Sequence, residues 1–336
     1  AGRGSSRACT TVSAAASRGR LRYRTLVLPY VTAPQPFGFY DAGGVPWPER
    51  TQQLIQEVLA AHKAQGVDFS GLTADDAQAV YAMNVFHAGP QAAVPRQGLW
   101  PHAWRLDRPV PLAPGRTAVD YQVSAMGDAL TLGVYCHENG HMLCEFPDLY
   151  ALADNARGVG RYCLMCLGCN ADPRNPTLPG AYLRWHAGWA DAQVLAPGPQ
   201  RLAPAPDGPL LLHRRSATEY LLIEHRRAEG RDAALHGSGL AVWHVDELGS
   251  NFSPEQAPPG HQHAECRLLQ ADGLRELDEG ADDGDGADLF APPRPAPFFT
   301  EGTALAPRWH DGTPTGLQLH SLRAEGDALV FVAELG

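Results

Sequence analysis

The sequence lacks the features that mark a protein for a membrane or for nucleic acid. Its longest apolar runs, such as 240–243 and 328–333, fall far short of the ~18 residues that a membrane-spanning helix requires. Basic residues are also few, because 27 Lys and Arg face 37 Asp and Glu, which gives a net charge of −10. No global positive field is therefore available to hold a phosphate backbone. These absences exclude a membrane span and argue against nucleic acid as a partner.

Motifs of two large enzyme classes are missing as well. The chain contains no G-x-S-x-G elbow and no glycine-rich phosphate loop, which leaves serine hydrolase and nucleotide-binding functions without support. The first twenty residues are small, polar and dotted with arginine, and they contain no apolar segment of the signal-peptide type. The residues themselves therefore give no targeting evidence.

The composition that is present is that of a globular α/β protein with many turns. Hydrophobic residues make up 44% of the chain and charged residues 19%, while 35 Gly and 29 Pro predict frequent turns. We expect a flexible N-terminal arm over 1–20, an α/β unit over 21–200 and a β-rich part over 201–336 that completes it.

Local patterns place the main elements of these parts. Apolar spacing predicts helices over 49–63, 129–146 and 181–189, with Pro147 ending the second. Strands are expected near the N-terminus over 21–31, 80–87 and 120–124. Short strands separated by Gly, Pro and Asp are expected later, over 210–213, 220–225, 239–245, 267–270, 317–322 and 328–333.

The chemistry of the chain concentrates in the helix predicted over 129–146. Residues 137–141 read H-E-x-x-H, and two imidazoles four residues apart project from one helix face, where they can bind one zinc ion. Glu138 stands next to the first ligand and would accept a proton from the zinc-bound water, then pass it to the leaving amine. Zinc would polarise the scissile carbonyl.

A catalytic zinc site needs a third protein ligand, and several residues compete for this role. Asp148 is favoured, because Pro147 ends the helix and lets the following residue turn back toward the metal. The alternatives are Cys144, Glu145 and a distant histidine such as His102 or His186.

Residues 133–150 resemble the active-site segment of the immune inhibitor A type secreted metallopeptidases. The signature of that family is an H-E-x-G-H helix followed closely by P-D-x-Y, which here is Pro147-Asp148-Leu149-Tyr150. The resemblance extends to the segments 98–104, 219–226, 239–247 and 270–273. It covers most of the chain from about residue 65.

The resemblance implies a metzincin-like zinc endopeptidase that is secreted and acts on protein or peptide substrates. It assigns the zinc ligands to His137, His141 and Asp148 and the general base to Glu138. It also implies a methionine-containing turn beneath the metal, and Met165 lies at the matching place within 161–168. The catalytic unit would then be residues 21–200.

Three further groups of residues have less specific patterns. Asp282, Asp283, Asp285 and Asp288 form an acidic loop, and members of the family bind calcium for stability, so calcium competes here with a simple solvated loop. The spacing Cys163-x-x-Cys166-x-x-Cys169 suits a disulfide or buried thiols better than a second metal. His244 and Asp246 alternate along a strand, and packing with a hydrogen bond explains them.

Two other functions are compatible with the same residues. A non-enzymatic descendant would keep the fold for binding a partner, although it would have no use for Glu138. A zinc hydrolase of non-peptide amides would carry the same helix. The sequence leaves substrate specificity and oligomeric state open.

Overall fold

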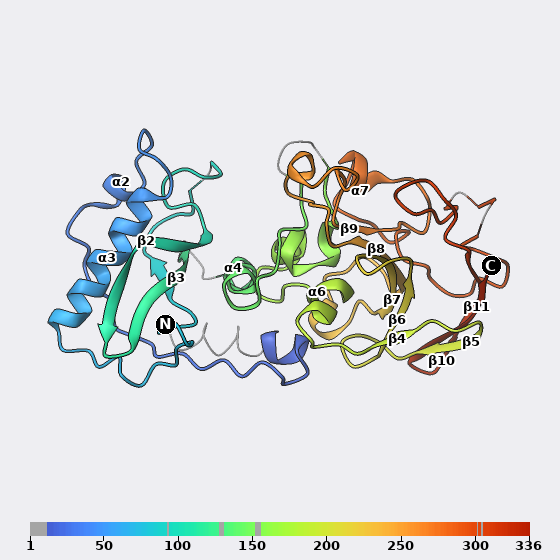
Figure 1. Cartoon of the computed structure of the whole chain (residues 1–336), viewed down its shortest axis with the longest axis horizontal. Coiled ribbons are helices and arrows are strands. Elements are labelled where there is room, and N and C mark those ends of the chain that lie inside the picture. The colour runs from blue at the N-terminus through green and yellow to red at the C-terminus, as the bar shows by residue number, and fades with distance from the viewer. Residues whose placement is uncertain (1–11, 93, 128–130, 152–155, 301, 304) are drawn as a thin grey trace. The chain divides into compact units, whose positions relative to one another are not determined.

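The computed structural model describes residues 12–92, 94–127, 131–151, 156–300, 302–303 and 305–336. Within these ranges the chain is a mixed α/β protein with three sheets and few helices (Figure 1). It divides into two units, one formed by Tyr23–Phe146 and the other by residues 12–22 together with Pro147–Gly336. The α/β class expected from the sequence is confirmed at this level.

The first unit is built on a three-stranded sheet in the order β1-β3-β2, in which β1 runs parallel and β2 antiparallel to β3. Its strands are β1 (Asn84–His87), β2 (His102–Ala113) and β3 (Arg116–Ala125). Its helices are α2 (Phe37–Tyr40), α3 (Glu49–Ala64) and α4 (Gly133–Cys144).

Strand β1 contacts both long helices because successive side chains of a strand point to opposite faces of the sheet. Val85 packs against the apolar cluster that α3 forms with β2 and β3. The neighbouring side chains contact α4: Asn84 accepts a hydrogen bond of 2.9 Å from Asn139, and the rings of Phe86 and Tyr135 lie 5.0 Å apart. Helix α4 is thus fixed to β1 in the turn that contains the H-E-x-x-H residues.

Most elements predicted for this unit are present, with one exception. The helix expected over 49–63 is α3. The strand expected over 80–87 is present only in its second half, as β1, and the one expected over 120–124 lies within β3. The strand expected over 21–31 is wrong, because this segment is irregular and its residues Leu26 and Tyr30 are exposed. Apolar alternation makes a strand only where another strand pairs with it, and none in the described ranges pairs with this segment.

The second unit contains two sheets. A five-stranded sheet has the order β4-β6-β7-β8-β9, and a three-stranded sheet has the order β10-β11-β5. The strands are β4 (Ala192–Val194), β5 (Gly198–Leu202), β6 (Leu210–Arg214), β7 (Glu219–Arg226), β8 (Gly239–Asp246), β9 (Cys266–Leu268), β10 (Leu317–Glu325) and β11 (Ala328–Leu335). The short helices are η1 (Gly160–Tyr162), η2 (Leu164–Gly168), α5 (Cys169–Ala171), α6 (Ala181–His186), η3 (Gly230–Asp232), η4 (Pro254–Gln256) and α7 (Glu276–Glu279).

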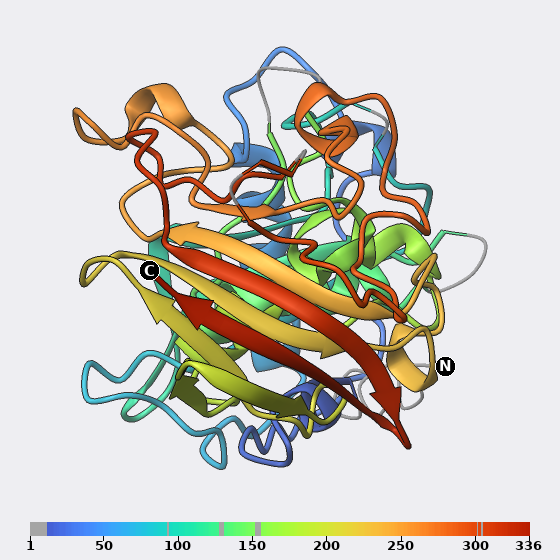
Figure 2. The same cartoon turned by 90° about the vertical axis from the view of Figure 1, so that its right-hand side faces the viewer.

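The two sheets of this unit enclose its main hydrophobic core. Figure 2 shows β10 and β11, in red, in front of the yellow and orange strands of the larger sheet. The core cluster takes side chains from both, such as Ile223 and Val242 from one sheet and Leu319 and Phe331 from the other, and each is fully or almost fully buried. The six strands predicted after residue 209 are all confirmed, with small shifts of their ends.

The expected arm over 1–20 lies partly outside the described residues, which begin at 12. Residues 12–16 form one helical turn, in which Val12 and Ala16 are buried. Arg20 forms an ion pair of 3.2 Å with Asp191 of the same unit. Among the helices of the described ranges, none has the length and apolar character needed to cross a membrane.

A network of buried charges connects β7 to the helices α6, η1 and η3 of the second unit. Arg184 of α6 is paired with Glu224, and Arg226 lies 3.3 Å from the same carboxylate. Arg226 also donates to Asp232 at 2.8 Å and to the carbonyl of Tyr162 at 3.0 Å. Burial alone would lower the pKa of Arg226, but the carboxylates of Asp232 and Glu224 raise it, so the guanidinium stays charged.

We expect Arg226→Met to destabilise the protein by about 3–5 kcal/mol, because it leaves two buried carboxylates short of their cation. The midpoint of urea unfolding measures this change. Arg227→Met is the matched control, since the neighbouring Arg227 pairs with the exposed Glu229 and Asp327 at the surface. Equal shifts for the two variants would contradict the importance of the buried network.

Candidate metal centre

Helix α4 holds the H-E-x-x-H residues in a protected place. His137 and Glu138 are each 7% exposed and Asn139 is 2% exposed. Because the helix repeats every 3.6 residues, His137 and His141 lie one turn apart on the same face. Their ring centroids are 4.8 Å apart and their planes are nearly perpendicular, at 85°. The two imidazoles thus lie next to each other on one helix face, edge to face.

The hydrogen bonds of His141 determine which of its ring nitrogens is available to a metal. Its Nδ1 lies 2.5 Å from the carbonyl oxygen of Phe146. A carbonyl oxygen only accepts, so Nδ1 carries the proton and Nε2 of the neutral ring presents a lone pair. That Nε2 lies 3.1 Å from Nε2 of His137. Two imidazole nitrogens are therefore brought together at one point.

The end of α4 sets the position of Phe146. Glu145 adopts a left-handed conformation with φ 55° and ψ 29°, which ends the helix two residues before Pro147. The amide of Phe146 then donates to the carbonyl of Gly140 at 3.2 Å, while its own carbonyl accepts from the ring of His141. The helix thus ends through the backbone conformation of Glu145, where the sequence had pointed to the proline.

Asp148, which follows Phe146 by two residues, lies close to the two histidines. Ligand atoms of His137, His141 and Asp148 all lie within 4.8 Å of one another. The group does not include the other residues considered for the third position: Glu145 and His186 are exposed, and His102 bonds to Tyr121. In the described part of the chain, no comparable group of potential ligands includes Cys144.

Met165 lies in a tight turn that contacts the segment of Asp148. Its side chain is fully buried, and its carbonyl accepts a hydrogen bond of 2.8 Å from the amide of Leu149. The turn is closed by the amides of Cys166 and Gly168, which donate to the carbonyl of Cys163 at 3.0 and 3.1 Å. A side chain at Gly168 would place its Cβ only 2.4 Å from that oxygen, so the turn requires glycine.

The donor set fits zinc. A tetrahedral zinc site with Zn–N bonds of about 2.0–2.1 Å places two imidazole nitrogens about 3.3 Å apart. The two Nε2 atoms here lie 3.1 Å apart, and Asp148 adds a carboxylate oxygen. Calcium and magnesium prefer oxygen ligands alone, so a site with two imidazoles favours a transition metal of the zinc class.

Three carboxylates of the acidic loop considered for calcium belong to two groups of potential ligands, which share Asp285. Asp285 forms one group with Asp288 and Asp272 and a second group with Asp282 and Glu276. Asp288 is 1% exposed, and its carboxylate accepts hydrogen bonds of 3.0 Å from the hydroxyl of Tyr162, 2.5 Å from the side-chain amide of Gln270 and 2.8 Å from the backbone amide of Asp285. Burial raises the pKa of Asp288, and hydrogen bonds from Asp285, Gln270 and Tyr162 oppose the shift.

Asp283, in the same loop, belongs to neither group of potential ligands and forms ion pairs instead. Its carboxylate forms ion pairs of 3.3 Å with Arg157 and 3.8 Å with Arg161. The sequence pattern grouped Asp283 with its acidic neighbours because it could not show that two arginines before the Met165 turn come close to this carboxylate. The same pattern did not indicate Asp272 and Glu276, which the fold brings to the loop.

The cysteines near the Met165 turn are buried. Cys163, Cys166 and Cys169 are at most 8% exposed, and burial raises the pKa of the Cys166 thiol. Among the described residues, no group of potential metal ligands contains a cysteine, and no disulfide joins two of the six described cysteines. Cys9 lies outside the described residues.

Sequence reasoning noted His244 and Asp246 but missed that they belong to a second gathering of potential ligands. It contains Glu219, His244 and His310 in one group and Asp246, His261 and His263 in another. The signal that was available is the pair His261 and His263, separated by one residue. The partner Asp246 is fifteen residues earlier than His261, and only the return of the chain at the end of β8 brings them together.

A comparison of the chain with models of protein families and with curated proteins finds no match.

We expect Glu145→Gly to stabilise the protein by about 0.5–1 kcal/mol. Glycine adopts a positive φ without the steric cost that a side chain incurs, and this gain exceeds its larger entropy in the unfolded chain. The free energy of unfolding in urea measures the effect. Glu279→Gly is the control, because Glu279 is exposed within helix α7, where glycine lowers stability. A loss of stability in Glu145→Gly would contradict the role given to this conformation.

Proposed function

We propose that the protein is a zinc-dependent endopeptidase of the metzincin-like, immune inhibitor A type. The observation that carries the proposal is the convergence of the Nε2 atoms of His137 and His141, 3.1 Å apart, in one group with Asp148. The methionine turn supports it, because Met165 bonds to the residue that follows Asp148. The likeness to that family also implies that the protein is secreted.

His137, His141 and Asp148 would hold the zinc. When bound, zinc polarises the scissile carbonyl and makes water more acidic. The hydrogen bond from Nδ1 of His141 to the carbonyl of Phe146 keeps the Nε2 lone pair directed at the site. This orientation exists before any metal binds, because it depends on the backbone that follows α4.

Glu138 is the group that would move the proton. It follows His137 directly on α4 and is 7% exposed, so its carboxylate is largely protected from bulk solvent. It accepts a proton from the attacking water and donates it to the leaving amine nitrogen as the peptide bond breaks. A carboxylate in this place serves hydrolysis and would have no use in a protein that only binds a partner.

An extended peptide substrate would add to the edge of the first sheet. Strand β1 is the edge strand, and in the described part of the chain it pairs only with β3. Its residue Asn84 is bonded to Asn139 of α4, so a peptide paired with this edge would run along the helix that carries Glu138. Backbone pairing explains endopeptidase activity without a strict requirement for particular side chains.

The proposal predicts that the purified protein cleaves unfolded casein and that a zinc chelator abolishes the cleavage. Added zinc restores it. Glu138→Gln is expected to lower kcat/KM by a factor of about 10²–10⁴, because the water loses its general base. Initial rates on casein measure both effects.

Glu145→Gln is the matched control, because it removes an exposed carboxylate seven residues further along the chain and should retain activity. Absence of cleavage by the zinc-loaded protein would contradict the proposal. Cleavage that resists the chelator, or that survives in Glu138→Gln, would contradict the mechanism.

A further inference from the structure

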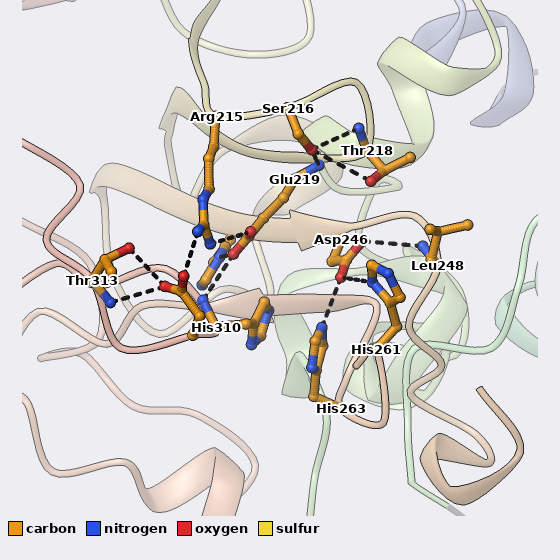
Figure 3. A network of polar contacts seen from close by, with 12 residues as sticks. Arg215, Ser216, Thr218, Glu219, Asp246, Leu248, His261, His263, His310 and Thr313 are labelled. Atoms are coloured by element: carbon orange, nitrogen blue, oxygen red, sulfur yellow. Dashed lines mark hydrogen bonds and ion pairs between the residues drawn. The ribbon is translucent and has the colours of Figure 1, made fainter. Parts of the chain in front are cut away.

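Four histidines gather around two carboxylates at one end of strands β7 and β8 (Figure 3). All belong to the second unit, so their arrangement is set within one compact part of the chain. The group comprises Glu219, His244, Asp246, His261, His263 and His310. The hydrogen bond expected to explain His244 is present, with its Nε2 3.1 Å from Glu219. Asp246 differs from His244, because two histidine side chains contact its carboxylate.

Two imidazoles converge on one oxygen atom of Asp246. Nδ1 of His261 lies 2.6 Å and Nε2 of His263 lies 2.8 Å from Oδ2 of Asp246. The two rings have centroids 6.1 Å apart and planes inclined at 56°, so their nitrogens approach the same point from different directions. Two imidazole nitrogens and one carboxylate oxygen around a single point form a donor set suited to zinc and related transition metals.

The neighbouring group does not have this geometry. The rings of His244 and His310 are stacked, 4.1 Å apart and inclined by only 20°, so their in-plane lone pairs run side by side. The carboxylate of Glu219 is already occupied by Arg215 at 2.8 Å and by the backbone amide of His310 at 2.8 Å. Glu219 and His244 are therefore joined by a hydrogen bond of structural character, and His310 contributes its backbone amide to it and not its ring.

The ion-pair partners of Asp246 are histidines and not permanently charged residues. Its side chain is 2% exposed, and its ion pairs in the described part of the chain are with His261 and His263, which are charged only when protonated. A buried carboxylate is stabilised strongly by a bound cation. His261 and His263 are 31% and 22% exposed, so an ion can reach the carboxylate from solvent and keep water as a further ligand.

The chain around these residues holds them in place. The carbonyl of His263 accepts from the amide of Ser250 at 2.9 Å, and a side chain at Gly249 would place its Cβ 2.8 Å from that carbonyl oxygen. The ring of His263 is stacked on His310 with centroids 3.5 Å apart and planes within 8°. The amide of Leu248 bonds the second oxygen of Asp246 at 3.2 Å. The potential ligands are thus arranged before an ion arrives.

We propose that Asp246, His261 and His263 bind a divalent transition-metal ion of the zinc class, at a second site separate from His137 and His141. The ion would replace the two ring-to-carboxylate hydrogen bonds. It would connect the end of β8 to the loop that leads to β9. The site draws nothing from α4, so it stands whether or not the protein is a peptidase.

The test uses the full chain and zinc itself. The variant His137→Ala/His141→Ala removes the H-E-x-x-H ligands, and the zinc it retains after equilibrium dialysis is counted by elemental mass spectrometry. We expect one equivalent per chain. Adding His261→Ala and His263→Ala should remove that equivalent and weaken zinc binding at least about 100-fold, because two of three protein ligands are lost.

The control is His320→Ala in the same background. His320 lies in the second unit, is 26% exposed and pairs with Glu334 at 3.3 Å, so it is also a histidine beside a carboxylate. It should leave the equivalent unchanged. Absence of bound zinc in His137→Ala/His141→Ala would overturn the proposal, and so would retention of the equivalent after the His261 and His263 substitutions.

A second measurement covers the case in which the multiple variant fails to fold. Cobalt(II) is titrated into His137→Ala/His141→Ala, and intense visible absorption bands distinguish a four- or five-coordinate protein-bound ion from the six-coordinate aqueous ion. The single variant His261→Gln, checked by circular dichroism, should lose intensity in these bands. Bands that are absent in the parent, or identical in His261→Gln, would overturn the proposal.

Discussion

The buried charge network around Arg226 is the constraint on which the second unit depends. Arg184 and Arg226 balance Glu224 and Asp232, and all four are at most 4% exposed. Charges removed from water are tolerable only when every partner is in place. Because Arg226 also donates to the carbonyl of Tyr162, the segment that leads into the Met165 turn is ordered together with β7. The conformation of the Met165 turn therefore depends on contacts with β7 as well as on its own residues.

Local sequence patterns were sufficient for the features that local geometry determines. The strands after residue 209 follow from short apolar runs between turn residues, and α3 follows from its apolar spacing. The pairing of His137 with His141 needs only the helical repeat. Asp148 is close in sequence as well, so a single turn of the chain brings it to the histidines.

Features that depend on distant contacts could not be predicted in the same way. The run over 21–31 has the composition of a strand but no strand to pair with in the described ranges. Asp283 belongs to an acidic stretch by sequence, yet Arg157 and Arg161 determine its contacts. Glu145 takes a backbone conformation that its residue type disfavours, and no local pattern announces such a position.

The backbone hydrogen bonds of Leu149 make its amide a useful probe in hydrogen-exchange experiments. Its amide donates to Met165 at 2.8 Å, its carbonyl accepts from Val159 at 3.1 Å, and its side chain is 1% exposed. An amide held in this way exchanges its hydrogen with solvent only when the surrounding segment opens. Since Leu149 follows Asp148 directly, the deuterium uptake of this one amide reports how firmly the segment of Asp148 is held, without any signal from a metal.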